Sequence, residues 1–177
     1  MKYRNIFAGM ACILLVAAAI FLWLVPGGPK AAPDITVFTT DGEQLAFSSL
    51  QGNPVLVTFW ATTCRTCVRE IPDLTELYRE LAPQGLKIIA IAMYYDPPNQ
   101  VLAMRKARDI PYTIALDIHA DAARAFGNVR LTPTAFMVAP DGRIVYRKTG
   151  ELPFKRLRKD IMTMLEQSAA GNQSQAG

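Results

Sequence analysis

The 177-residue chain is 51% hydrophobic and 19% charged, which is enough for one α/β domain and a membrane segment but leaves no room for a second domain. Its formal net charge is +4, of which Lys2 and Arg4 supply two charges, and the remaining +2 is too small to indicate a nucleic-acid-binding protein. Three cysteines suit a redox protein better than a scaffold held together by disulfides.

Residues 6–25 predict a transmembrane helix. They are uncharged and mostly apolar, and a run of about 20 such residues crosses a hydrocarbon core as a helix. Lys2 and Arg4 precede the run, so the positive-inside rule places residues 1–5 in the cytoplasm and the rest of the chain on the extracytoplasmic side. A cleaved signal peptide is the alternative, but its apolar region is normally shorter. Residues 26–33, rich in glycine, proline and alanine, are interpreted as a linker.

The domain that follows is predicted to begin with a β-hairpin. Residues 35–38 and 44–47 flank Asp41-Gly42, a dipeptide typical of tight turns between strands. Residues 55–60 then form a nearly continuous apolar run. Such a run is typical of a central strand that is buried on both faces.

Two cysteines mark the segment after this strand. If a helix begins near Cys64, its sulfur lies where unpaired backbone N–H groups and the helix dipole favour an anion, and Arg65 adds a neighbouring cation. Cys67 lies one turn later on the same side, within reach of a disulfide. The spacing therefore predicts a nucleophilic sulfur at Cys64 and a resolving sulfur at Cys67.

Other uses of the cysteine pair fit the sequence less well. An intramolecular zinc site needs two more ligands, but the only other cysteine is Cys12, within the predicted membrane helix, and the only histidine is His119, in a predicted loop. Haem attachment needs a histidine where the chain has Val68. A structural disulfide across so short a loop adds little stability. We therefore expect no metal and no cofactor beyond the redox-active pair itself.

Strands and helices alternate through the rest of the domain. The predicted strands are residues 86–93, 113–116, 134–138 and 144–146, and the predicted helices are residues 64–82, 99–108, 120–126 and 153–167. This alternation predicts an α/β fold with a central mixed sheet flanked by helices on both faces. Residues 168–177 are small and polar, and we expect a disordered tail.

Several motifs together resemble the thioredoxin superfamily. They are Phe59-Trp60-Ala61, Cys64-Arg65-Thr66-Cys67, Pro72 and Thr132-Pro133-Thr134. The N-terminal apolar segment and Glu70-Ile71-Pro72 narrow the resemblance to the membrane-anchored TlpA/ResA-like thiol-disulfide oxidoreductases. The resemblance implies a thioredoxin-like fold over residues 34–167, with the N-terminal hairpin and with an inserted helix and strand (99–108 and 113–116) that plain thioredoxins lack.

The resemblance also points to further site residues. Glu70, one turn after Cys67, stands where ResA-like proteins carry an active-site acid and is predicted to accept the Cys67 proton through water. The alternative is an ordinary solvated carboxylate on the helix surface. Pro133 is predicted to follow a cis peptide bond and, with Thr132, to present the backbone to an extended substrate. Trp60 is expected to shield the disulfide, to pack in the core, or both.

Three positions depart from the family pattern. Thr63 stands where most relatives have tryptophan, Thr66 where many have proline, and Thr58 where thioredoxin-like proteins often bury an aspartate. The dipeptide Arg65-Thr66 between the cysteines tunes thiolate stability and hence the reduction potential. We therefore include both residues in the predicted binding site, and the direction of electron flow stays open at this point.

The sequence thus predicts a protein-disulfide reductase anchored in the cytoplasmic membrane, with its catalytic domain on the extracytoplasmic side. The resemblance implies a membrane electron donor of the DsbD/CcdA type and exported substrates such as apocytochrome c. The alternatives are a disulfide oxidase or isomerase with the same site, a copper-binding chaperone for oxidase assembly, a peroxidase, and a non-catalytic docking module. Against the peroxidase, Ala61 stands where that chemistry expects threonine.

Overall fold

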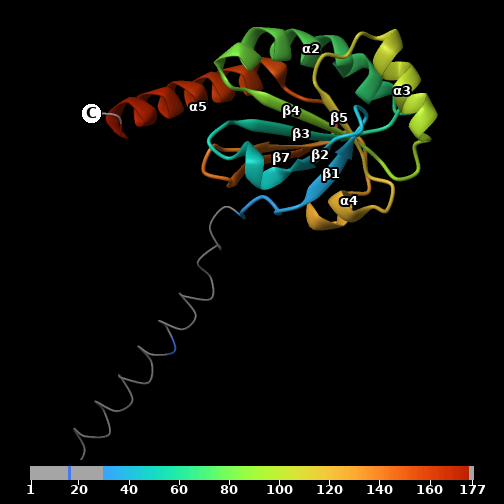
Figure 1. The fold of residues 1–177 in the computed structure, drawn as a ribbon, viewed down its shortest axis with the longest axis horizontal. Helices are drawn as coiled ribbons and strands as arrows, with labels where there is room; N and C mark the ends of the chain where they lie inside the picture. The colour runs from blue at the N-terminus through green and yellow to red at the C-terminus, as the bar shows by residue number, and fades with distance from the viewer. Residues whose placement is uncertain (1–15, 17–29, 176–177) are drawn as a thin grey trace, which may run out of the picture. The chain divides into compact units, whose positions relative to one another are not determined.

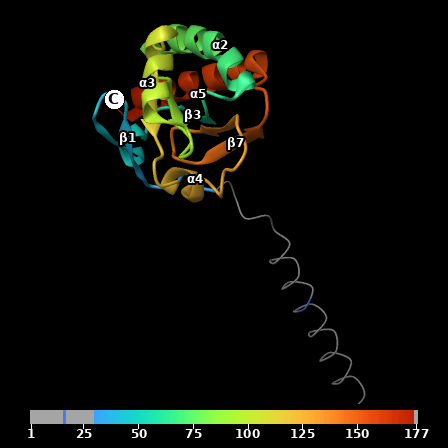
Figure 2. The ribbon, with the colours of Figure 1, turned by 90° about the vertical axis from the view of Figure 1, so that its right-hand side faces the viewer.

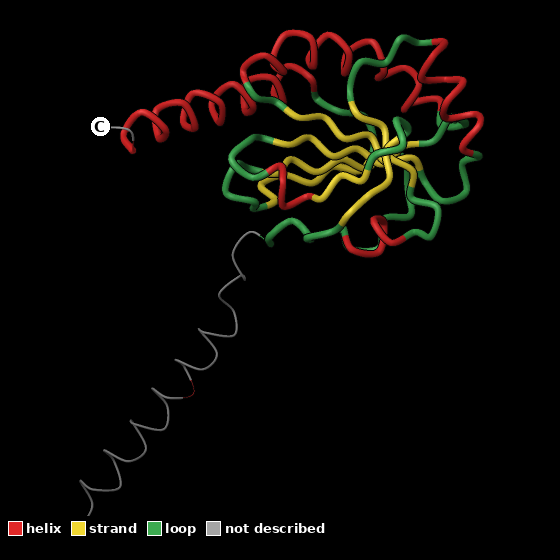
Figure 3. Tube along the Cα trace, in the orientation of Figure 1, coloured by secondary structure: helices red, strands yellow, loops and turns green. Residues whose placement is uncertain are grey.

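The computed structural model describes residue 16 and residues 30–175, with side chains as far as residue 170. From Ala31 onward the chain forms a compact unit around a seven-stranded sheet in the order β2-β1-β5-β4-β3-β6-β7 (Figures 1 and 3). The strands are β1 (Thr36–Thr39), β2 (Gln44–Ala46), β3 (Val55–Trp60), β4 (Lys87–Ala92), β5 (Thr113–Leu116), β6 (Thr134–Val138) and β7 (Ile144–Thr149). The helices are α2 (Arg65–Leu81), α3 (Pro98–Ala107), α4 (Asp121–Ala125) and α5 (Phe154–Gln175), with short 3-10 turns η1 (Phe47–Leu50) and η2 (Ala82–Gln84).

The middle of the sheet is the apolar strand β3. All six of its residues are buried, because β3 pairs with β4 on one side and β6 on the other and helices cover both of its faces. The pairing with β4 is parallel and the pairing with β6 is antiparallel. The predicted mixed sheet is therefore confirmed, and the continuous apolar run follows from burial on both faces.

Two apolar cores lie on opposite faces of the sheet. Helices α2, α3 and α5 cover one face, and α4 with η1 covers the other (Figures 1 and 2). Helix α2 places a stripe of apolar side chains at helical spacing towards the first core, and this stripe comprises Cys67, Ile71, Leu74, Leu77 and Leu81. The helix continues through Pro72, which is exposed. This stripe fixes which side of α2, and hence which cysteine, faces the interior.

The topology gathers several loops at one end of the sheet, which we call the site edge. The parallel strands β3, β4 and β5 all end there, and β6, antiparallel to β3, begins there. Backbone hydrogen bonds continue the ladder past the strand ends, from Met93 N–H to the Trp60 carbonyl and from Asp117 N–H to the Ala92 carbonyl, each 3.0 Å. The loops after β3, β4 and β5 and the loop before β6 therefore lie next to one another, as is usual for ligand sites on open α/β sheets.

The N-terminal hairpin forms as predicted, with Gly42 at a φ of 83° in its turn. A residue with a side chain is strained at such an angle, which accounts for glycine here. The second strand is shorter than predicted, because Phe47 begins the η1 turn and is buried in the core beneath α4.

The C-terminal helix differs from the prediction. Helix α5 extends to Gln175, so the predicted end at residue 167 and the predicted disordered tail from 168 are wrong for the residues described. Ala169 and Ala170 favour helix, and lengthening an existing helix costs less than starting one. Figure 1 shows this end of α5 extending beyond the sheet. Arg158 in α5 contacts Glu76 and Glu80 of α2, which ties the two helices together.

The predicted membrane helix, residues 6–25, lies outside the described residues except for residue 16. Within the described part of the chain, no helix combines the length and the apolar character that a membrane crossing requires. The anchor, and the sidedness that follows from it, therefore remain predictions.

Candidate active site

The predicted nucleophile lies at the beginning of α2. The turn after β3 closes with a 3.0 Å hydrogen bond from the Cys64 N–H to the Ala61 carbonyl. Cys64 is the N-cap residue of α2, and its sulfur accepts the Cys67 N–H at 3.2 Å. A sulfur in this position faces the positive end of the helix dipole, so a thiolate formed there is stabilised.

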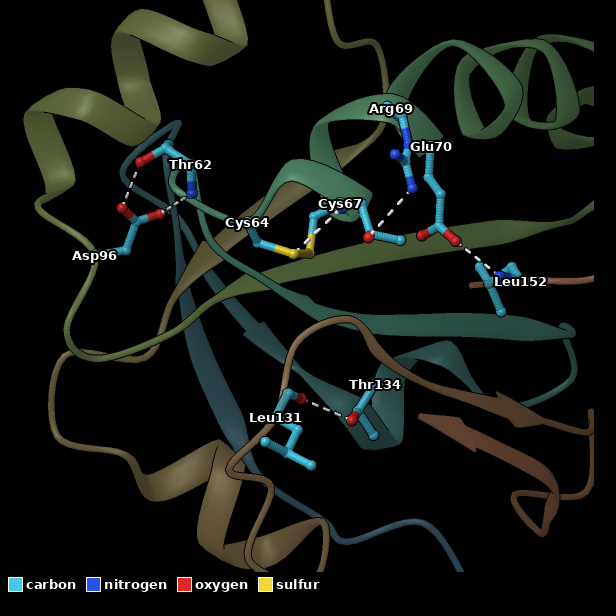
Figure 4. Close-up of a disulfide and its surroundings, with 10 residues drawn as sticks. Thr62, Cys64, Cys67, Arg69, Glu70, Asp96, Leu131, Thr134 and Leu152 are labelled. Carbon is cyan, nitrogen blue, oxygen red and sulfur yellow. Dashed lines mark hydrogen bonds between the residues drawn. A yellow bond between two sulfur atoms is a disulfide. The ribbon is translucent and has the colours of Figure 1, made fainter. Parts of the chain in front are cut away.

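Cys64 and Cys67 form a disulfide, with their Cα atoms 5.3 Å apart (Figure 4). The two sulfurs differ in access, because Cys64 is half-buried and Cys67 is only 3% exposed. An incoming thiol or disulfide therefore meets Cys64, while Cys67 is placed to attack Cys64 from the interior. Arg65 is exposed beside the pair, and the Thr66 hydroxyl accepts a 3.4 Å hydrogen bond from Arg69.

Glu70 lies on the buried side of α2. It is 3% exposed, and one of its carboxylate oxygens accepts the Leu152 N–H at 2.7 Å (Figure 4). Burial raises the pKa of Glu70 above its ordinary value of 4.5, and the hydrogen bond from Leu152 opposes this only in part. The carboxyl group is therefore shifted towards the pH range in which proton-transfer groups work.

A small cavity joins Glu70 to the buried cysteine. Glu70, Cys67, Trp60, Thr58 and Tyr112 are among its lining residues, and it offers about 10 Å³ of room, the lower limit for one water molecule. The buried Trp60 Nε1–H has no hydrogen-bond partner among the described residues. A water in this cavity would thus have the two or more polar neighbours that buried waters require.

The segment before β6 forms the other side of the site. The Thr132–Pro133 peptide bond is cis, as predicted, and Pro133 is buried while Thr132 is half-buried. The Thr134 hydroxyl donates to the Leu131 carbonyl at 2.7 Å, and Thr134 pairs with Phe59 of β3. This pairing places Thr132 and Pro133 beside the end of β3 that leads to Cys64. Their neighbours Leu131 and Thr134 lie across from the disulfide in Figure 4.

Comparison with known proteins identifies the family. A model described as Redoxin matches residues 28–162. The chain belongs to the Redoxin family. The thiol-disulfide oxidoreductase ResA of Bacillus subtilis strain 168 is 28% identical to this redoxin over 135 residues, which are 76% of this chain and 74% of ResA. ResA from a strain of Bacillus cereus is 30% identical over 125 residues, 69% of each chain.

This redoxin is also similar to solved structures. A thiol:disulfide interchange protein of the thioredoxin family from Chlorobium tepidum TLS superposes with a TM-score of 0.72 at 25% identity, covering 80% of this chain and 99% of that one. Together with the cysteine pair at disulfide distance, these matches show a thioredoxin-like fold and a thiol-disulfide oxidoreductase.

One residue of the site is not apparent from the sequence. Asp96, in the loop after β4, is 5% exposed. Its carboxylate accepts the Thr62 N–H at 2.7 Å and the Thr62 hydroxyl at 2.6 Å (Figure 4). These charge-assisted hydrogen bonds fix the loop between β3 and α2 at Thr62, two residues before Cys64. Asp96 and Thr62 are 34 positions apart in the sequence. The only sequence signal for this contact is that Asp96 is an acidic residue shortly after a predicted strand.

Trp60 and His119, the remaining residues considered from the sequence, lie in different parts of the domain. Trp60 is buried in the core beside Cys67, so it packs behind the disulfide. His119 is exposed and lines a separate pocket at the site edge. Among the described residues, no three histidine, cysteine or acidic side chains are grouped closely enough to bind a metal ion.

Proposed function

We propose that this chain is an extracytoplasmic protein-disulfide reductase. The proposal depends mainly on the different surroundings of the two cysteines. Cys64 is accessible at the helix N-cap, whereas Cys67 is buried and lines a small cavity together with Glu70. The reducing direction requires that the mixed disulfide with the substrate be resolved, and the buried Cys67 beside Glu70 is placed for that step.

The proposed reaction begins with the reduced pair. The Cys64 thiolate attacks one sulfur of a substrate disulfide, forms a mixed disulfide and displaces the other substrate sulfur, which takes up a proton from solvent. Cys67 then passes its proton through the cavity water to the Glu70 carboxylate and attacks Cys64. The second substrate sulfur leaves and is protonated, so that two electrons and two protons have passed to the substrate. The Cys64–Cys67 disulfide is the oxidised product.

A further cycle needs an external reductant. We propose a membrane thiol carrier of the DsbD/CcdA type, which would donate two electrons to the Cys64–Cys67 disulfide by the same exchange chemistry. Residues 6–25 would anchor the chain in the cytoplasmic membrane with its N-terminus inside. The linker at 26–33 would keep the domain near the membrane, where exported proteins such as apocytochrome c emerge.

Deleting the gene tests this proposal in the organism that encodes it. We expect cytochromes with covalently bound haem to fall severalfold in membrane extracts, because apocytochrome cysteines would stay oxidised. The wild-type gene, or a thiol reductant added outside the cells, should restore them, and the Cys64→Ser gene should not. Unchanged cytochromes would argue against this substrate class, and loss of disulfides from exported proteins would indicate an oxidase.

A further inference from the structure

The loops of the site edge expose four large apolar side chains. Tyr94, Tyr95, Ile118 and Leu131 are 57%, 48%, 57% and 66% exposed. Tyr94, Tyr95 and Ile118 come from the loops after β4 and β5, which the Met93–Trp60 and Asp117–Ala92 backbone hydrogen bonds align with the end of β3. Leu131 comes from the loop before β6, which the pairing of Thr134 with Phe59 brings to the same edge. Exposed apolar groups collected in one place are typical of a surface that binds another molecule.

A pocket of about 420 Å³ opens among these loops. Tyr94 and Ile118 are among its lining residues, together with Asn128 and Arg130 from the loop that leads to Leu131 and Pro133. Its volume lies in the range of pockets that hold a ligand or a few side chains. In Figure 4, Leu131 lies below the disulfide, and Arg130, which lines the pocket, directly precedes Leu131 in the chain.

The charged side chains that line this pocket are Arg124 and Arg130, and none of the described residues that line it is acidic. The Arg124 guanidinium is paired with Asp121. Arg130 is exposed and has no ion pair or hydrogen bond within the described residues. Its guanidinium can therefore receive a carboxylate in the two-pronged geometry that arginine favours.

We propose that this pocket is a specificity site for substrate segments that carry an acidic side chain, with apolar neighbours, close to the disulfide to be reduced. The proposal rests on the proposed reductase activity and names its substrate class. Arg130 binds the carboxylate, while Tyr94, Ile118 and Leu131 contact the apolar neighbours. The positive charge of Arg130, unpaired among the described residues, complements an acidic side chain, and Arg130 lies two residues before Thr132 of the active site.

The test uses two cyclic disulfide peptides that differ only in charge. One has glutamate on both sides of its cysteine pair and the other has glutamine at those positions, and both carry a leucine next to each. The reduced full-length chain is mixed with each peptide, and the second-order rate constant of peptide reduction is measured at low salt. We expect the glutamate peptide to react roughly fivefold faster, the effect of one well-formed surface ion pair.

Two variants locate the effect. In Arg130→Gln the ratio of the two rate constants should fall to about one, and in Arg130→Glu the glutamine peptide should become the faster substrate. The matched control is Arg79→Gln, near the other end of α2, roughly 20 Å from Cys64 along the helix, which should keep the wild-type ratio.

Equal rates for both peptides with the wild-type chain, or an unchanged ratio in Arg130→Gln, would overturn the pocket assignment while leaving the reductase intact. If neither peptide is reduced, the proposed function itself fails.

Discussion

Replacing Cys67 by serine is expected to halt the reaction at the mixed disulfide. The probe is a chromogenic symmetric aryl disulfide, and all chains carry Cys12→Ala so that Cys64 and Cys67 are their only thiols. With the parent chain, attack by Cys64 releases one aryl thiolate and attack by Cys67 releases a second. The Cys67→Ser chain should release only the first and keep one aryl thiol covalently bound, as absorbance and intact mass would show.

Cys64→Ser is the matched control for this experiment. It has the same number of thiols, but its remaining sulfur, that of Cys67, is 3% exposed and lies behind the helix N-terminus. Reaction with the aryl disulfide should therefore be slower by at least an order of magnitude, since exchange depends on access to the thiolate. If Cys64→Ser formed its adduct as fast as Cys67→Ser does, the two cysteines would have the opposite roles.

Replacing Glu70 by glutamine is expected to slow the second step and leave the first step nearly unchanged. Glutamine keeps an oxygen that can accept the Leu152 N–H but cannot take a proton from Cys67. Loss of a general base costs roughly 100-fold or more, so release of the second aryl thiolate should slow by about that factor. Stopped-flow absorbance separates the two phases, and Glu76→Gln, an exposed position on the same helix, is the charge-matched control.

The pH dependence of the second phase gives an independent readout. Burial raises the pKa of Glu70 above its ordinary value of 4.5. A base must be ionised to accept a proton, so the rate of the second phase should rise as the pH increases through this raised pKa. Glu70→Gln should remove that rise. An equal slowing of both phases, or a pH profile that survives the substitution, would show that Glu70 only supports the helix.

The sequence predicts the strand and the helix that form this site because their sequence signals come from residues close together in the chain. The apolar run of β3, the cysteine spacing at the start of α2 and the hairpin turn at Asp41-Gly42 each depend on neighbouring residues, and the structure confirms them. Strand β5 is confirmed with both of its predicted ends. The position of Glu70 one turn after Cys67 predicts its side of the helix, but its burial, at 3% exposed, is known only from the structure.

Contacts between distant segments are what the sequence does not predict. Asp96 reaches Thr62, and Leu152 reaches Glu70, across gaps of 34 and 82 residues, and neither pairing leaves a periodic or compositional trace. The pocket around Arg130 is likewise assembled by topology, because it needs three loops brought to one edge. The end of α5 fails for a different reason, since a small polar composition does not exclude helix once the helix has begun.

The central claim, that Cys64 and Cys67 form a reducing pair, is tested most directly by their reduction potential. The Cys12→Ala chain is equilibrated with thiol redox buffers, quenched with acid, and the ratio of dithiol to disulfide is measured by mass after alkylation. Thioredoxin, at about −270 mV, and the oxidant DsbA, at about −120 mV, mark the two limits. We expect a value near or below the first. A value near the second would contradict the account and make this chain an oxidase.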